Sequence, residues 1–227
     1  MMKKIIALLL IAVLCVGVMA SCKKEEISVV DQVGAMYNNS EPTKIVAQTA
    51  MQFGDKTLNS SYVLTVGYVD GKVAATYESS EDVMNDVASG SGEQIVGPIG
   101  TKTETMWYLE GKGVSVNKAN KWDSSAESFI PEKGAVAITL SSELIKDYTY
   151  EDNKLSFTVA AADTAKVFGE DLAVDADVFV EIVNDGAVVT SIALSYTLAA
   201  NEAENVQQTS VTITVDYTYD LEQISFK

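Results

Sequence analysis

An alternation of apolar and polar residues near the C-terminal end constrains the fold more than any other feature of the sequence. From residue 211 to residue 221 every second side chain is apolar or aromatic, and every residue between them is threonine or aspartate. Successive side chains of a β-strand point to opposite faces of a sheet, so the pattern predicts a strand with one buried and one solvated face. Such a strand needs neighbouring strands and a layer that covers its apolar face.

The same period of two recurs along most of the chain and is interrupted by turn sequences. Asp70-Gly71 and Asn184-Asp185-Gly186 are typical of tight hairpins. Strands are predicted at residues 44–53, 61–69, 72–79, 103–109, 114–118, 135–140, 154–161, 177–183, 187–198 and 209–221. Because short turns join consecutive strands, the sequence predicts an antiparallel meander.

Helical spacing is confined to short segments. Ser141 and Asp163 are suited to cap two of them, and a loop rich in glycine and serine is expected at 88–102. The predicted fold class is α+β, mainly β: a single large curved antiparallel sheet, or half-barrel, with helices covering the concave face. The predicted helices lie at residues 27–38, 81–87, 142–148 and 164–168.

The N-terminal segment has the layout of a leader peptide. Lys3 and Lys4 precede an apolar run over residues 5–18, and small or flexible residues separate that run from Cys22. The run is shorter than the roughly 20 residues that cross a bilayer as a helix. Met19-Ala20-Ser21-Cys22 resembles the bacterial lipobox, in which the cysteine is diacylated on sulfur and becomes the mature N-terminus.

This resemblance predicts a lipoprotein signal peptide at 1–21, a short tether at 22–26 and a single domain at 27–227. We expect an extracytoplasmic protein that is anchored to the bacterial cell membrane by the lipid on Cys22, because two acyl chains hold stably where one is marginal. The alternative is an ordinary secretory signal cut near Ser21, which would leave a free thiol. Cys15 lies within the leader, so the mature chain would have no internal disulfide.

The composition excludes several classes of function. The chain has no histidine and no arginine, and loss of Lys3 and Lys4 with the leader would change the net charge from −16 to −18. Without histidine there is no Ser-His or Cys-His nucleophile and no imidazole metal ligand. A strongly acidic chain also repels phosphate backbones, so no nucleic-acid partner is expected. We expect a monomer without a cofactor or metal that is not an enzyme, with its charge serving solubility.

Aromatic and apolar residues suggest one candidate ligand site. Met106, Trp107 and Tyr108 stand together in the chain, and Leu64 and Val66 lie on one side of a predicted strand. These five residues are the candidate ligand-binding residues, because such side chains line apolar pockets. The alternative is ordinary core packing, in which the same residues bury each other.

Two motifs that could indicate ion or phosphate binding do not fit their patterns. Residues 171–177 hold three aspartates, but the alternating oxygen ligands and the central glycine of a calcium loop are missing. Residues 97–102 lack the spacing of a phosphate-binding P-loop. No metal-binding or catalytic residue is therefore assigned.

The order of parts resembles the LolA/LolB-like lipoprotein superfamily, which includes the LppX and LprG group and uncharacterised Firmicutes lipoproteins. The resemblance rests on the lipobox, the first helix, the consecutive hairpins, the hairpin MWYLEGKGVSVNKANKW at 106–122 and the long C-terminal strands. It implies a half-barrel closed by helices that carries lipids or lipoproteins in its hollow. It transfers no ligand-contact residue, because no side-chain motif of the family aligns.

Three functional hypotheses follow. The first is a membrane-anchored lipoprotein that binds a lipid or another hydrophobic ligand in the hollow of the sheet. The second is a non-catalytic structural or interaction lipoprotein of the cell envelope whose core is filled by its own side chains. The third, an acid–base hydrolase, would require a buried carboxylate with a raised pKa in a polar cleft.

Overall fold

The structure is a computed structural model that describes residues 27–84, 98–117, 121–126, 136–200, 208–220 and 222–224. Cys22, the predicted leader and the predicted tether lie outside the described residues. So does most of the predicted loop at 88–102, apart from residues 98–102.

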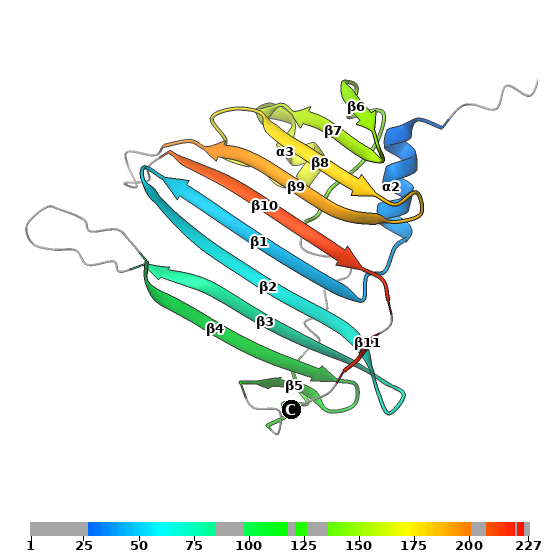
Figure 1. Cartoon of the computed structure of the whole chain (residues 1–227), viewed down its shortest axis with the longest axis vertical. Coiled ribbons are helices and arrows are strands. Elements are labelled where there is room, and N and C mark those ends of the chain that lie inside the picture. Colours follow the sequence, from blue (N-terminus) through cyan, green and yellow to red (C-terminus); the bar gives the residue numbers. More distant parts are fainter. Residues whose placement is uncertain are drawn as a thin grey trace, which may run out of the picture.

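Within the described residues, ten strands form one open antiparallel sheet in the order β5-β4-β3-β2-β1-β10-β9-β8-β7-β6 (Figure 1). The protein is mainly β and the sheet is curved, which confirms that part of the predicted fold class. A short β11 (Glu222–Gln223) pairs in parallel with β2. The strands of the main order are β1 (Lys44–Phe53), β2 (Lys56–Val69), β3 (Lys72–Met84), β4 (Pro98–Leu109), β5 (Gly113–Val116), β6 (Tyr148–Glu151), β7 (Lys154–Val159), β8 (Val178–Asn184), β9 (Val189–Leu198) and β10 (Thr209–Thr218).

Tight turns fix the register of the hairpins. At the β2–β3 turn, φ is 50° at Asp70 and 77° at Gly71, and at the β6–β7 turn φ is 50° at Asp152 and 61° at Asn153. Two consecutive left-handed residues are the signature of the type I′ turn, whose twist matches that of the strands it joins. The predicted Asp70-Gly71 hairpin turn is therefore confirmed.

The sheet has two chemically different faces, which follow from the alternation along each strand. We call the face that carries the buried residues of β8, β9 and β10 the inner face. Its fully buried members include Val180 on β8, Ile192 on β9 and Val215 on β10. The opposite, outer face of β10 carries Thr212 and Asp216, which are exposed. The predicted buried and solvated faces of this strand are thus confirmed.

Only two short α-helices are described, and both pack against one half of the inner face (Figure 1). The α2 helix (Val29–Asn39) contacts β9, and its Tyr37 ring meets the edge of Tyr217 on β10, with ring centroids 6.4 Å apart. The α3 helix (Thr164–Phe168) follows the 3₁₀ turn η1 (Ala161–Asp163). A helical cover over the whole concave face is therefore not shown by the described residues.

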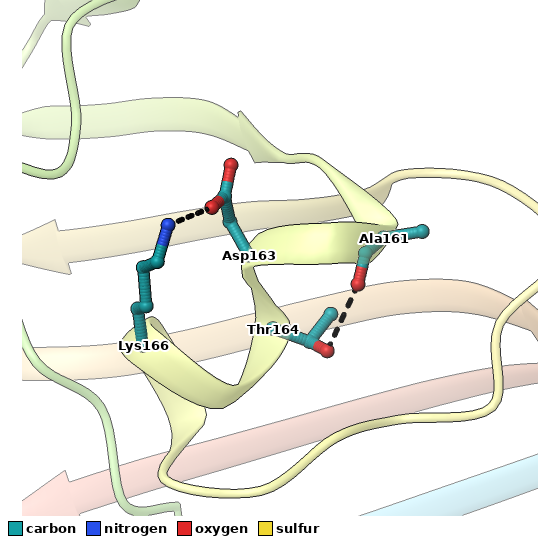
Figure 2. Close-up of polar contacts among 4 residues, drawn as sticks. All are labelled: Ala161, Asp163, Thr164 and Lys166. Carbon is teal, nitrogen blue, oxygen red and sulfur yellow. Dashed lines mark hydrogen bonds and ion pairs between the residues drawn. The ribbon is translucent and has the colours of Figure 1, made fainter.

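Polar contacts hold the η1–α3 turn in shape (Figure 2). Thr164 Oγ1 donates a hydrogen bond to the Ala161 carbonyl and accepts one from the Leu172 N–H. Asp163 stands at the N-cap position of α3 but makes no capping hydrogen bond, and its carboxylate instead pairs with Lys166 at 2.6 Å. The predicted helix is confirmed, although the predicted capping bond of Asp163 is wrong.

Three other local predictions differ from the structure. Residues 81–84 are the end of β3 rather than a helix, and residues 98–102 begin β4 rather than belonging to a loop, because the two segments pair with each other. Residues 136–140 bury alternate side chains but form no strand ladder. They cover α3 through a hydrogen bond from the Thr139 N–H to the Val167 carbonyl.

The predicted helix after Ser141 is a single turn. The Ser141 carbonyl accepts hydrogen bonds from the Leu144 and Ile145 N–H groups, and its Oγ accepts one from the Glu143 N–H. The chain then enters β6 at Tyr148. Ser141 therefore caps a turn as predicted, but too few residues separate it from the sheet for a helix to form.

Candidate ligand-binding face

The inner face of the sheet is filled in one half and half-exposed in the other. Over β7 to β10 the covering elements are α2, α3 and residues 136–145, and most inner side chains are almost fully buried, whereas Tyr196 and Ile213 are partly buried. Over β2 to β4 neither of the two described α-helices lies on the inner face (Figure 1). We call this second region the open face, and define it by Tyr62, Leu64, Val66, Tyr77, Met106 and Tyr108.

Strand register brings the open-face residues together. Leu64 on β2 pairs with Tyr77 on β3, and Tyr77 pairs with Met106 on β4. Two residues further along the strands, Val66 and Tyr108 flank Ala75 in the same way. Leu64 is almost fully buried, whereas Val66, Met106 and Tyr108 are half-buried. Four of the five candidate residues therefore share one surface.

The fifth candidate, Trp107, lies on the other side of the sheet. It follows Met106 directly in β4 and pairs with Thr76 and Ser115, which belong to the outer face. Adjacent residues of a strand cannot face the same way, so Trp107 cannot line a pocket with Met106 and Tyr108. Trp122, from the same aromatic group of the sequence, lies near β5, where Lys112 Nζ is 5.7 Å from its ring centroid.

Tyrosines dominate the open face and its border with the filled half. The rings of Tyr62 and Tyr77 lie 5.4 Å apart at a tilt of 32°. Burial, together with the neighbouring hydroxyls of Tyr77 and Tyr37, raises the pKa of Tyr62 to about 12. Burial also raises the pKa of Tyr217 and of Tyr37, whose hydroxyl donates to the Val136 carbonyl. The phenols thus stay neutral and present rings together with uncharged hydrogen-bonding groups.

A hollow of about 280 Å³ opens on the inner face where β3 and β4 leave the apolar part of the sheet. Glu81 and Lys102 pair across the two strands, with 3.2 Å between Lys102 Nζ and Glu81 Oε1. Glu104 pairs with Ser79 one step closer to the aromatic residues. The hollow therefore joins an apolar wall to a polar one, and is lined by Tyr77, Ser79, Glu81, Lys102, Glu104 and Met106.

A second hollow, of about 360 Å³, lies beside α3 on the inner face of β9 and β10. Phe168, Leu194 and Ile213 give it an apolar lining. Tyr196 also lines it, and both burial and the nearby Glu170 carboxylate raise the pKa of this tyrosine. Its size matches the lower range of ordinary ligand pockets.

Sequence reasoning missed the residues that give the open face its chemistry. Tyr62 and Tyr77 were not recognised as partners because their contact depends on the register between β2 and β3. Glu104 looked like one acid among many, and the α3 hollow depends on how residues 136–137 fold over the sheet. The alternation of Tyr62, Leu64 and Val66 was the usable signal, since it already placed all three on one side of a strand.

Clusters of metal-ligating side chains and helices suited to cross a membrane were sought in the described part of the chain. No group of three or more metal-ligating side chains is found there. At residues 171–177, Val174 bridges to Leu198 and Asp175 accepts a hydrogen bond from Gln208. No described helix is long and apolar enough to cross a bilayer.

Comparisons with known proteins show no family membership. No family model matches the chain, and no curated protein matches it significantly in sequence. Among solved structures, a DUF1329 family protein from Desulfovibrio piger aligns with 85% of this chain and 93% of its own length. The sequence identity is 8% and the TM-score is 0.24, so the chain is only distantly similar to that protein.

Proposed function

We propose that the protein is a membrane-anchored bacterial lipoprotein that binds a lipid or another hydrophobic ligand against the open face. The observation that carries this proposal is the contrast between the two halves of one inner face. Val66, Tyr77, Met106 and Tyr108 remain half-exposed although they belong to the same face as the fully buried residues of β8 and β9. Contiguous apolar surface of this kind marks interaction sites.

A ligand that covers the open face gains the free energy of burying it. Removing apolar surface from water contributes about 25 cal/mol per Å². The tyrosine rings add hydrogen-bonding hydroxyls at the edge of that surface, which suits an amphipathic ligand. The order of parts that resembles the LolA/LolB-like lipoproteins supports the same proposal.

Anchoring is proposed through Cys22. The lipid on this residue, followed by a tether of a few residues, would hold the domain close to the membrane from which a lipid could be taken. Mass spectrometry of the mature N-terminal peptide tests this: a diacylglyceryl group on Cys22 is the expected result. An intact leader on the mature protein, or an unmodified Cys22 thiol in the membrane fraction, would contradict it.

A structural role is the second candidate, and the filled half of the sheet favours it. Leu155, Val180 and Ile182 are fully buried among the core residues of this half. If residues outside the described part of the chain fill the open face in the same way, the protein would present only its surface to partners. Ligand binding is then not expected.

Native mass spectrometry separates the two candidates. The full chain with Cys22→Ala, purified from cells without detergent, should carry a hydrophobic adduct if the open face binds a ligand. The substitution Val66→Asp should abolish that adduct by placing a charge in the apolar surface. Phe179→Asp is the matched control, since Phe179 is 45% exposed on the outer face of β8. The proposal would be contradicted if both variants lost the adduct, or if the chain with Cys22→Ala alone carried none.

A further inference from the structure

We propose that the hollow between β3 and β4 binds the quaternary ammonium head of an amphiphile whose alkyl chain lies on the open face. This inference rests on the proposed function and names the class of ligand. It requires a wall of aromatic rings, an unpaired negative charge beside that wall, and a continuous apolar surface for the chain. Each requirement is met by residues of β2, β3 and β4.

The aromatic wall is formed by Tyr77 and the ring that packs against it. Tyr77 lines the hollow, and its ring lies 5.4 Å from that of Tyr62. The faces of aromatic rings attract cations, and quaternary ammonium groups are recognised mainly in this way because they cannot donate hydrogen bonds. Met106 adds a polarizable thioether on the side of the neighbouring strand.

The charge of the hollow favours a cation. Its one lysine, Lys102, is paired with Glu81 at 3.2 Å. Glu104 lines the same hollow and has no ion-pair partner among the residues that the structure describes. Two carboxylates against one ammonium leave the hollow negative, and the chain has no arginine that could offset this for a phosphate or sulfate head.

The open face continues directly from the hollow. Tyr77 and Met106 belong to both, and the next inner-face row along the strands holds Val66, Ala75 and Tyr108. The two rows are about 7 Å apart, since each residue of a strand rises about 3.4 Å. An alkyl chain attached to the head would therefore run along the strands from Glu104 towards Tyr108.

Calorimetric titration with probes that share one chain and differ in the head tests the inference. The full chain with Cys22→Ala would be titrated with dodecyltrimethylammonium, dodecyl sulfate and dodecyl maltoside, each below its micelle concentration, and with choline. The trimethylammonium probe should bind at least about fivefold more tightly than the sulfate probe, as expected for one partly screened charge pair. Choline should bind much more weakly, because it lacks the chain.

Glu104→Gln should bring the ratio of the trimethylammonium affinity to the sulfate affinity close to one. Lys102→Gln should increase this ratio. Glu78→Gln is the matched control, because Glu78 lies on the same pair of strands but on the outer face, where it pairs with Thr105. Circular dichroism and the urea midpoint verify that each variant is folded.

Each remaining outcome has one meaning. Equal or tighter binding of dodecyl sulfate by the unsubstituted hollow, or a preference that survives Glu104→Gln, would overturn the ammonium site and leave ligand binding by the open face standing. Failure of all three dodecyl probes to bind would overturn the proposed function itself.

Discussion

The two halves of the inner face obey the same strand register and yet differ in chemistry. Over β7 to β10 the inner side chains are mostly branched aliphatic, such as Val178, Ile182 and Ile192, and they are fully buried. Over β2 to β4 the inner side chains include four tyrosines and a methionine beside Leu64 and Val66, with carboxylates further along the strands. Branched aliphatic side chains pack densely under a cover, whereas tyrosines tolerate a surface that is partly wet.

The cover explains why only one half is closed. Residues 136–145 contact both α2 and α3, and they approach α2 closely at Gly34. A Cβ atom at this position would lie 2.7 Å from the Leu140 carbonyl oxygen, so only glycine allows the contact. Asp31 ties the same segment to the first turn of α2 by accepting hydrogen bonds from the Ser142 N–H at 2.8 Å and from its Oγ at 2.6 Å.

The largest expected effect contrasts the interiors of the two halves. Ile182→Ala removes a fully buried side chain from the filled half and should lower the free energy of unfolding by about 2–5 kcal/mol. Met106→Ala on the half-exposed face should cost about 1 kcal/mol or less, because less apolar surface is lost from the folded state. Equilibrium urea unfolding measures both. Equal losses would mean that the open face is as fully covered as the filled half.

The next effect tests the close approach of the cover. Gly34→Ala places a methyl group against the Leu140 carbonyl and should destabilise the protein by about 1–3 kcal/mol, although alanine is the better helix former. Ala35→Gly, at the exposed neighbouring position of α2, is the control and should cost about 1 kcal/mol through helix propensity alone. A stabilised Gly34→Ala variant would show that residues 136–140 do not rest on the helix.

An alkaline titration tests the burial of the tyrosines that lie where the filled half meets the open face. Burial raises the pKa of Tyr37, Tyr217 and Tyr219, and that of Tyr62 to about 12. A raised folded-state pKa gives stability that is complete below the unfolded value of 10 and is lost as the pH rises through the folded value. Stability should therefore fall above pH 10. Absorbance at the phenolate band should show these four tyrosines ionising only above pH 10; their ionisation in folded protein at pH 10 would contradict the burial.

An acid titration tests the attachment of the cover to α2. Hydrogen bonds from the Ser142 side chain and backbone, with a smaller one from Ser28, hold the pKa of Asp31 below its ordinary value of 3.8. A lowered folded-state pKa gives stability that is complete above the unfolded value and is lost as the pH falls through the folded one. Asp31→Asn should therefore be less stable than the natural chain at pH 7, and the difference should shrink as the pH falls below 3.8. A difference that persists in acid would assign the effect to something other than the Asp31 charge.

How much of this could be predicted from the sequence depends on how local the cause is. The alternation of β10 and the Asp70-Gly71 turn specify strands and hairpins by themselves, and both predictions are confirmed. The ends of β3 and β4 could not be predicted, because residues 81–84 show no alternation of polar and apolar side chains and form a strand by pairing with residues 98–102. Residues 136–140 show the reverse: their alternation is real, but no neighbouring strand is available, so they form part of the cover.

The candidate site also combines features that the local sequence predicts with features that depend on strand pairing. Alternation alone placed Leu64 with Val66. The prediction grouped Trp107 with Met106 and Tyr108, although adjacent residues of a strand face opposite sides of the sheet. The contact between Tyr62 and Tyr77 and the position of Glu104 in the hollow required the register across three strands, which no single strand encodes. The shape of a site on a sheet is therefore less predictable than the face on which it lies.

The smallest expected effect concerns the ion pair at the edge of the open face. Lys102 and Glu81 are both more than half exposed, with side-chain exposures of 62% and 57%. Such pairs contribute between zero and about 1 kcal/mol, because solvent screens them and two long side chains lose freedom. Lys102→Gln should therefore change the urea midpoint very little, and the control Glu81→Gln should behave alike. A large loss in the lysine variant alone would mean that Lys102 balances Glu104 as well as Glu81, and the open face would then be held together by charge and not only by apolar contacts.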